Sequence, residues 1–158
     1  MKQLHELSRV FPAEFVHDPP KGKFGKYIQH SVIRQRLLSV VGPYSQEVKQ
    51  VFKENIKDGQ GQFIEVVTGC ILALTIEVDG QLVTVEEVGE CEKPLNWKTD
   101  GARMKDAISD AIKRCAMAIG CGLHLWAVSP DGKSSEYFLD KQLEKALDER
   151  YQRSSRFI

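Results

Sequence analysis

The clearest pattern of apolar and polar positions along the chain lies between residues 103 and 122. Five apolar residues recur there at intervals of four, three, four and four: Met104, Ile108, Ala111, Cys115 and Ile119. This spacing places the five side chains on one face, so it predicts an amphipathic α-helix that stops at Gly120 and Gly122. The charged side chains lie off that face: Arg103, Asp106, Asp110 and the pair Lys113-Arg114.

The middle of the chain has the pattern of a β-hairpin. Phe63–Val78 and 81–88 are rich in Val, Ile, Leu and Thr, and Asp79-Gly80 joins them. Asp-Gly between two apolar runs is a strong signal for a two-residue hairpin turn. Acidic residues along both runs indicate that one face of the hairpin is solvated: Glu65, Glu77, Glu86 and Glu87.

The other segments complete an α+β pattern. A short helix or arm is expected before Pro12, a helix over 27–41 that stops at Gly42-Pro43, and a polar-faced helix over 139–151. Residues 123–126 suit a short strand or an extension of the preceding helix. The segment 45–57 is ambiguous, because its apolar spacing fits a helix while its β-branched residues and the following Asp58-Gly59 turn fit a strand.

Composition narrows the class of protein. The chain has 158 residues, enough for one domain with a core, and 42% of them are hydrophobic. No apolar stretch is long enough for a membrane span, and the N-terminus lacks the apolar core of a signal peptide, so we expect a cytoplasmic protein without a membrane partner. The four cysteines are irregularly spaced, and we expect them to be reduced and buried.

The formal net charge is zero, but the charges are unevenly distributed. No acidic residue occurs from Pro19 through Gln46, and this window contains five cations and three interleaved aromatic residues: Lys21, Lys23, Lys26, Arg34, Arg36, Phe24, Tyr27 and Tyr44. Cations combined with aromatic side chains are typical of proteins that bind single-stranded nucleic acid. The same strip also fits an exposed loop followed by the outer face of a helix.

Catalytic and metal-binding patterns are weak. Gly132-Lys133-Ser134 resembles the end of a phosphate-binding loop, but Ala127 stands where that motif requires glycine. The spacing of Cys115, Cys121 and His124 is poor for a metal site. No nucleophile and base can be paired by spacing. We therefore expect no enzyme activity, no metal and no cofactor.

The pair Lys113-Arg114 has two interpretations. Cations near the end of a helix are favoured by the helix dipole, so the pair could be a solvated helix end. Together with the acid-free strip, the pair also suits contacts to phosphates, which supply most of the sequence-independent affinity for nucleic acid.

The order of the segments resembles the annealing domain of the Rad-fifty-two family, in particular its small bacteriophage-type members. The likeness covers about residues 21–139. Residues 27–33 resemble the start of the family's first core helix, and the hairpin through Asp79-Gly80 to Gly89 resembles its β-β unit. Residues 106–120 resemble the family's most recognisable helix, in which an acid, a Lys-Arg pair and a following glycine have this spacing. Met117 stands where the family often has a further cation.

The resemblance implies an α+β fold in which an antiparallel sheet with a β-β-β-α core packs against a long helix. It favours a strand over 45–56, and it implies subunits joined edge to edge in an oligomeric ring. A single annealing domain would cover 1–158, with an N-terminal arm (1–20), a core (21–139) and a C-terminal helix (140–158).

For function, the resemblance implies ATP-independent binding and annealing of single-stranded DNA in recombination and repair, with a single-strand-binding protein or a recombinase as a further partner. A phage-encoded protein would act in the cytoplasm of its bacterial host. The expected DNA-binding residues are Lys113, Arg114, Tyr27, Lys21, Lys23, Lys26, Arg34, Arg36 and Arg103. Two alternatives stay open: a DNA-end-protecting or RNA-binding module without annealing activity, and a small metabolic enzyme with a pocket between hairpin and helix.

Overall fold

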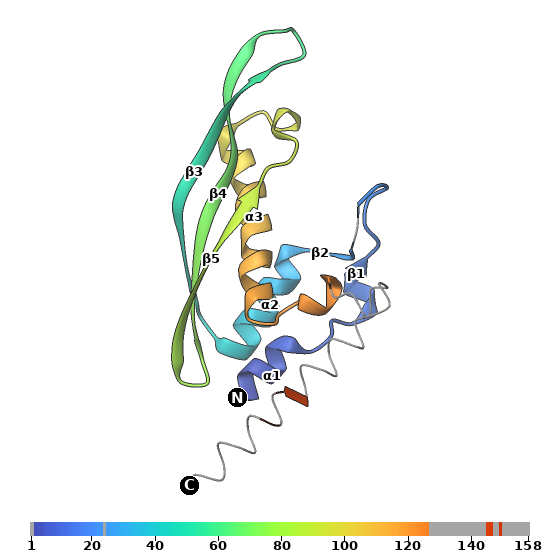
Figure 1. The fold of residues 1–158 in the computed structure, drawn as a ribbon, viewed down its shortest axis with the longest axis vertical. Coiled ribbons are helices and arrows are strands. Elements are labelled where there is room, and N and C mark those ends of the chain that lie inside the picture. Colours follow the sequence, from blue (N-terminus) through green and yellow to red (C-terminus); the bar gives the residue numbers. More distant parts are fainter. Residues whose placement is uncertain (1, 24, 127–144, 147–148, 150–158) are drawn as a thin grey trace. The chain divides into compact units, whose positions relative to one another are not determined.

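A three-stranded antiparallel sheet forms the middle of the chain. The computed structural model describes residues 2–23, 25–126, 145–146 and 149. The strands are β3 (Ser45–Lys57), β4 (Phe63–Val78) and β5 (Gln81–Glu90), in the order β3-β4-β5. Figure 1 shows them side by side. The hairpin predicted at Asp79-Gly80 is confirmed, and the ambiguous segment 45–57 is a strand.

The pairing of β3 with β4 is interrupted twice. The register shifts between Val48 and Gln50 and again between Phe52 and Lys53, where the pairing skips Thr68. Such bulges bend a strand and leave backbone groups without a partner in the ladder. The N–H of Val67, next to the second bulge, donates instead to the carboxylate of Asp100 at 3.1 Å.

Helix α3 (Asp100–Ala118) covers one face of β4 and β5. Of the face predicted from the spacing, Ala111 and Cys115 are buried, whereas Met104, Ile108 and Ile119 are half-buried. Ala107 and Ile112 are buried as well. The Cys115 Sγ lies 3.6 Å from the carbonyl oxygens of two strand residues, Leu72 in β4 and Val85 in β5. The helix begins three residues before Arg103 and ends just ahead of Gly120, which has a φ of +89°.

A second group of elements comes from both ends of the described chain. It contains α1 (Lys2–Ser8), the two-stranded antiparallel pair β1 (Val16–His17) and β2 (Tyr27–Ile28), and α2 (His30–Val41). Short 3-10 helices cover Ala13–Phe15 and Leu123–Trp126, and a third covers Pro94–Asn96 beside the three-stranded sheet. Helices α1 and α2 pack together, with Leu7, Ile33 and Leu37 fully buried.

The helix predicted over 27–41 begins too early. Tyr27 and Ile28 form β2 and pair with β1, and Gln29 keeps an extended backbone, so α2 starts at His30. The expected stop at Gly42 is confirmed. The helix predicted over 139–151 lies mostly outside the described residues.

Contacts between Cα atoms divide the chain into two compact units. The first unit contains the described parts of 1–43, 77–82 and 116–126, and the second contains 44–76 and 83–115. The fold is α+β with antiparallel sheets, as predicted from the pattern. Assembly into a ring and a single annealing domain stay predictions.

Candidate nucleic-acid interface

The segment 18–26 joins β1 to β2 in the first unit, and the described part of its residues 21–26 is here called the basic turn. The pairing of His17 with Tyr27 holds its two ends together. Lys21, Lys23 and Lys26 are all exposed. No acidic residue occurs from Pro19 through Gln46, and the nearest acid in the sequence is Asp18, before Lys21. The turn therefore presents a local positive charge on the surface.

Tyr27 extends this surface. Its side chain is 44% exposed, and its ring centroid lies 6.4 Å from that of His17 across the two-stranded pair. The next residue, Ile28, is buried and holds the strand in the core of the unit. Alternation along β2 thus directs Tyr27 outward beside the basic turn.

Arg34 and Arg36 differ although they lie two residues apart on α2. The Arg36 guanidinium donates to the carbonyl oxygens of Glu6, Leu7 and Arg9 at 3.3, 3.4 and 2.8 Å, and lies 4.1 Å above the ring of Phe11. It therefore satisfies carbonyls at the end of α1, which have no partner within that helix. Burial lowers its pKa. Arg34 is partly exposed, and its Nε lies 3.4 Å from the Nδ1 of His30.

Lys113 and Arg114 lie on α3 among acidic residues. The Arg114 Nε contacts the carboxylate of Asp110 at 3.2 Å, and this carboxylate also accepts the backbone N–H of Glu90. Lys113 is half-buried, and burial lowers its pKa although Asp110 and Asp106 raise it. The neighbouring acids reduce the positive potential of the pair.

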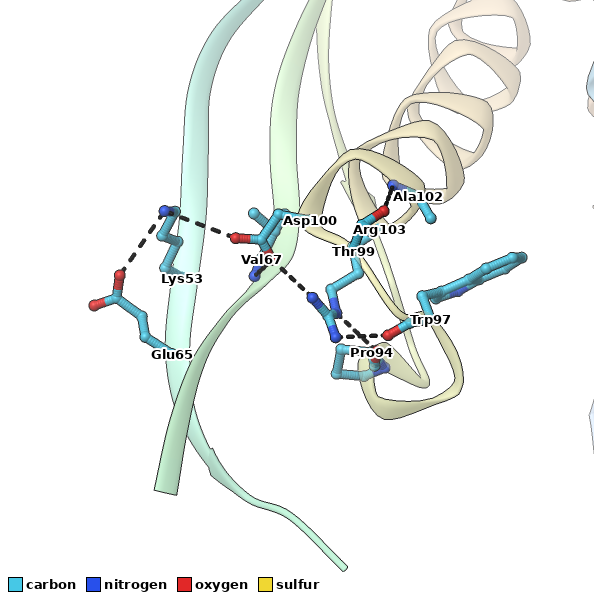
Figure 2. A network of polar contacts seen from close by, with 9 residues as sticks. All are labelled: Lys53, Glu65, Val67, Pro94, Trp97, Thr99, Asp100, Ala102 and Arg103. Atoms are coloured by element: carbon cyan, nitrogen blue, oxygen red, sulfur yellow. Dashed lines mark hydrogen bonds and ion pairs between the residues drawn. The ribbon is translucent and has the colours of Figure 1, made fainter. Parts of the chain in front are cut away.

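Arg103 is buried in a network of polar contacts at the start of α3 (Figure 2). Its guanidinium donates to the carbonyl oxygens of Pro94 and Trp97 at 2.8 and 2.6 Å, and to the Asp100 carboxylate at 2.9 Å. The two carbonyl contacts hold the 94–97 turn against the helix. The side chain expected to bind DNA is thus occupied inside the protein.

Asp100 joins this network to the sheet (Figure 2). The hydrogen bond from Val67 N–H, followed by the one from Arg103, lowers the pKa of the Asp100 carboxyl. The Nζ of Lys53 lies 3.9 Å from the same carboxylate and 3.8 Å from that of Glu65. One carboxylate therefore links β3, β4 and the start of α3.

The structure separates the expected DNA-binding residues into two groups. The first unit holds the basic turn, Tyr27, Arg34 and Arg36, and the second unit holds Arg103, Lys113 and Arg114. Trp126, which is not among the expected residues, is an exposed aromatic residue whose ring packs against Gly25 in the basic turn. In the sequence, the feature that could have pointed to Trp126 is its place as an aromatic residue shortly after the glycines that follow α3.

A groove of about 800 Å³ crosses the sheet of the second unit. Apolar side chains from β3 and β5 line it, including Val51, Phe52 and Val88. Its charged lining consists of one cation and three acids: Lys53, Glu54, Glu90 and Glu92. A net negative lining repels phosphate, so this groove does not suit a nucleic-acid backbone.

The four cysteines are free and buried, as predicted. Burial raises the pKa of Cys91 and Cys115 to about 11, and that of Cys121 to about 12. At neutral pH these thiols are protonated and suit core packing.

Within the described residues, no three His, Cys, Asp or Glu side chains come together as a metal site would require. No helix in that part of the chain combines the length and apolarity needed to cross a bilayer.

Comparison with known proteins adds no relative. Neither the models of known protein families nor the curated protein sequences contain a match to this chain.

Proposed function

We propose that this protein binds single-stranded DNA and anneals complementary strands without ATP. The observation that carries the proposal is the basic turn: three exposed lysines in a segment without acids, with the exposed ring of Tyr27 beside them. Lysines contact phosphates whatever the sequence, and aromatic rings stack on any base. This combination suits a single strand, whose bases are accessible.

Lys113 and Arg114 form a second proposed DNA contact, which lies within the second unit. They are assigned by the resemblance to the Rad-fifty-two family, and Arg114 is exposed on α3. A phosphate near Arg114 would compete with Asp110 for the guanidinium. Arg36 and Arg103 take no part in the proposal, because their guanidinium groups are bonded to backbone carbonyls.

Strand β3 supports the proposal that the protein works as an oligomer. It lies at one edge of the sheet, and all of its residues except Phe52 and Ile56 are exposed. Val48 and Val51 are among the exposed side chains. An edge strand that exposes apolar residues is prone to pair with another chain. Joined subunits would repeat the basic turn along one DNA strand and so multiply weak contacts.

Annealing needs no chemical step in this proposal. Cations on the protein reduce the repulsion between the phosphates of two strands, which otherwise slows their pairing. A strand bound through its backbone keeps its base edges free to meet a complement. No nucleotide hydrolysis is required, because pairing itself is downhill in free energy.

Equilibrium binding to a fluorescent thymidine oligonucleotide at several salt concentrations tests this function. Replacing Lys21, Lys23 and Lys26 with Ala should weaken binding. If each lysine contacts one phosphate, the slope of log affinity against log salt should fall in magnitude by about 2, since each contact to a single strand contributes about 0.7.

A control variant removes the same charge elsewhere. It replaces three exposed lysines of the second unit with Ala: Lys57, Lys93 and Lys98. The control should keep most of the affinity and of the salt slope. Equal losses in the two variants would contradict the assignment of the basic turn, while preference for duplex ends or RNA would favour a protecting or RNA-binding module instead.

A further inference from the structure

Trp126 lies at the end of a short helix whose two middle residues are buried. In the 3-10 helix Leu123–Trp126, His124 and Leu125 are buried, whereas Trp126 is 47% exposed. The buried Leu125 is part of the core of the first unit. Trp126 therefore lies at the surface, and the buried side chains next to it hold its backbone in place.

The indole ring packs directly on the basic turn. A Cβ added to Gly25 would lie 2.7 and 2.8 Å from the Cε3 and Cζ3 atoms of Trp126, so the ring occupies the space that a side chain would need. Gly25 also has a φ of +84°, which favours glycine. The backbone N–H of Lys26 donates to the carbonyl oxygen of Leu125 at 3.3 Å. The ring and the turn are thus held together.

This packing places Trp126 next to the groups already assigned to DNA. Lys26 follows Gly25 directly, and Tyr27 is two residues away with 44% of its surface exposed. The ring of Trp126 contacts the turn, and 47% of the residue is exposed. A rigid, partly exposed indole loses little conformational entropy when a flat partner stacks on it.

We propose that Trp126 is a base-stacking residue for single-stranded DNA, next to the phosphate-binding lysines of the basic turn; this inference rests on the proposed function. Stacking engages the face of a base and leaves its hydrogen-bonding edge free. It therefore holds the strand without hiding the edges that a complementary strand must read. Trp126 adds binding free energy that does not depend on charge.

Trp97 provides a matched comparison within the same chain. It is 42% exposed, close to the value for Trp126, but it belongs to the second unit and lies beside the buried Arg103. The chain has two tryptophans, so Trp97→Phe leaves Trp126 as the sole reporter and Trp126→Phe leaves Trp97. Indole fluorescence then separates the two positions.

The test titrates both single-tryptophan proteins with a thymidine oligonucleotide. Emission from Trp126 should be quenched on binding, and emission from Trp97 should change little. Loss of one stacked base corresponds to about 1–3 kcal/mol, which is roughly a 5- to 150-fold loss of affinity for Trp126→Ala. The salt dependence should stay unchanged, because no phosphate contact is removed. Trp97→Ala should bind like the wild type.

A second pair of variants covers the case in which Trp126→Ala does not fold. Trp126→Phe keeps an aromatic face and should retain most of the affinity, whereas Trp126→Leu keeps apolar volume without such a face and should lose it. Equal affinity of Trp126→Leu and wild type would overturn the stacking role while leaving the proposed function intact. Failure of the wild type to bind single-stranded DNA at all would overturn both.

Discussion

The missing side chain of Gly89 decides how closely α3 approaches β5. A Cβ at this position would collide with the carbonyl oxygen of Ala107 and would lie 2.6 Å from the backbone nitrogen of Ala111. Both groups belong to the helix backbone, which cannot move away as a flexible side chain could. The helix can pack on the strand at this distance only because residue 89 is glycine.

Replacing Gly89 with Ala should therefore destabilise the protein. We expect the free energy of unfolding to fall by about 1–3 kcal/mol, the usual cost of overpacking a core, measured by chemical denaturation. Gly59→Ala is the control, since a Cβ there meets no atom within 4 Å. It should change stability by less than about 0.5 kcal/mol. Equal stability of the two variants would show that α3 is not this close to β5.

Two arginines on α2 give a second test of residue roles. Arg36→Lys keeps the charge but loses the planar group that reaches three carbonyls and the ring of Phe11. We expect a loss of about 1–3 kcal/mol in unfolding free energy, since hydrogen bonds to charged groups are worth about 1.5–3 kcal/mol. Arg34→Lys should be nearly neutral. Thermal unfolding of both variants checks this, and similar melting temperatures would contradict the structural role of Arg36.

At the scale of elements, the sequence pattern predicted those features that depend on residues close together in the chain. The Asp79-Gly80 turn and the apolar spacing along α3 depend on neighbours in sequence, and both elements were predicted correctly. The start of α2 was not, because Tyr27 pairs with His17 ten residues earlier. The chain between 45 and 57 fits two periods equally well, and only pairing with β4 selects the strand.

The same limit applies to the candidate site. Nothing near Arg36 in the sequence shows that backbone carbonyls occupy its guanidinium group, since these partners lie about thirty residues away. The basic turn could be found because its charge and its lack of acids are properties of consecutive residues. Trp126 was missed because its contact with Gly25 joins positions a hundred residues apart.

The junction of β4 with the start of α3 should respond to acid. Hydrogen bonds from Val67 and Arg103 lower the pKa of Asp100 below its ordinary value of about 3.9. A depressed pKa in the folded state means that this stabilisation is complete above the ordinary pKa and is lost as the pH falls through the lower, folded-state pKa. Asp100→Asn keeps an acceptor oxygen for Val67 but removes the charge.

We expect the wild type to be more stable than Asp100→Asn at pH 6, with the difference shrinking as the pH falls below about 4. Urea denaturation at a series of pH values from 6 to 2.5 measures this difference. A difference that stays constant over that range would contradict the role of the charged carboxylate in the network.

At the scale of the whole molecule, zero net charge is compatible with binding DNA because the charges are unevenly placed. The basic turn carries exposed lysines without acids, while Glu54, Glu90 and Glu92 line the groove of the second unit. One subunit offers only a few phosphate contacts. Pairing of subunits through the exposed edge strand β3 would supply more phosphate contacts. A change that prevents this pairing should therefore abolish oligomer formation and annealing activity together.

The most direct test of the proposed function is the rate at which two complementary oligonucleotides pair, with and without the protein, in the absence of ATP and metal. We predict acceleration that fades as salt rises and that is lost in Lys113→Ala/Arg114→Ala. A variant lacking two other exposed cations, Lys57→Ala/Lys98→Ala, should still accelerate pairing. Pairing at the spontaneous rate in the presence of the wild-type protein would contradict the proposal.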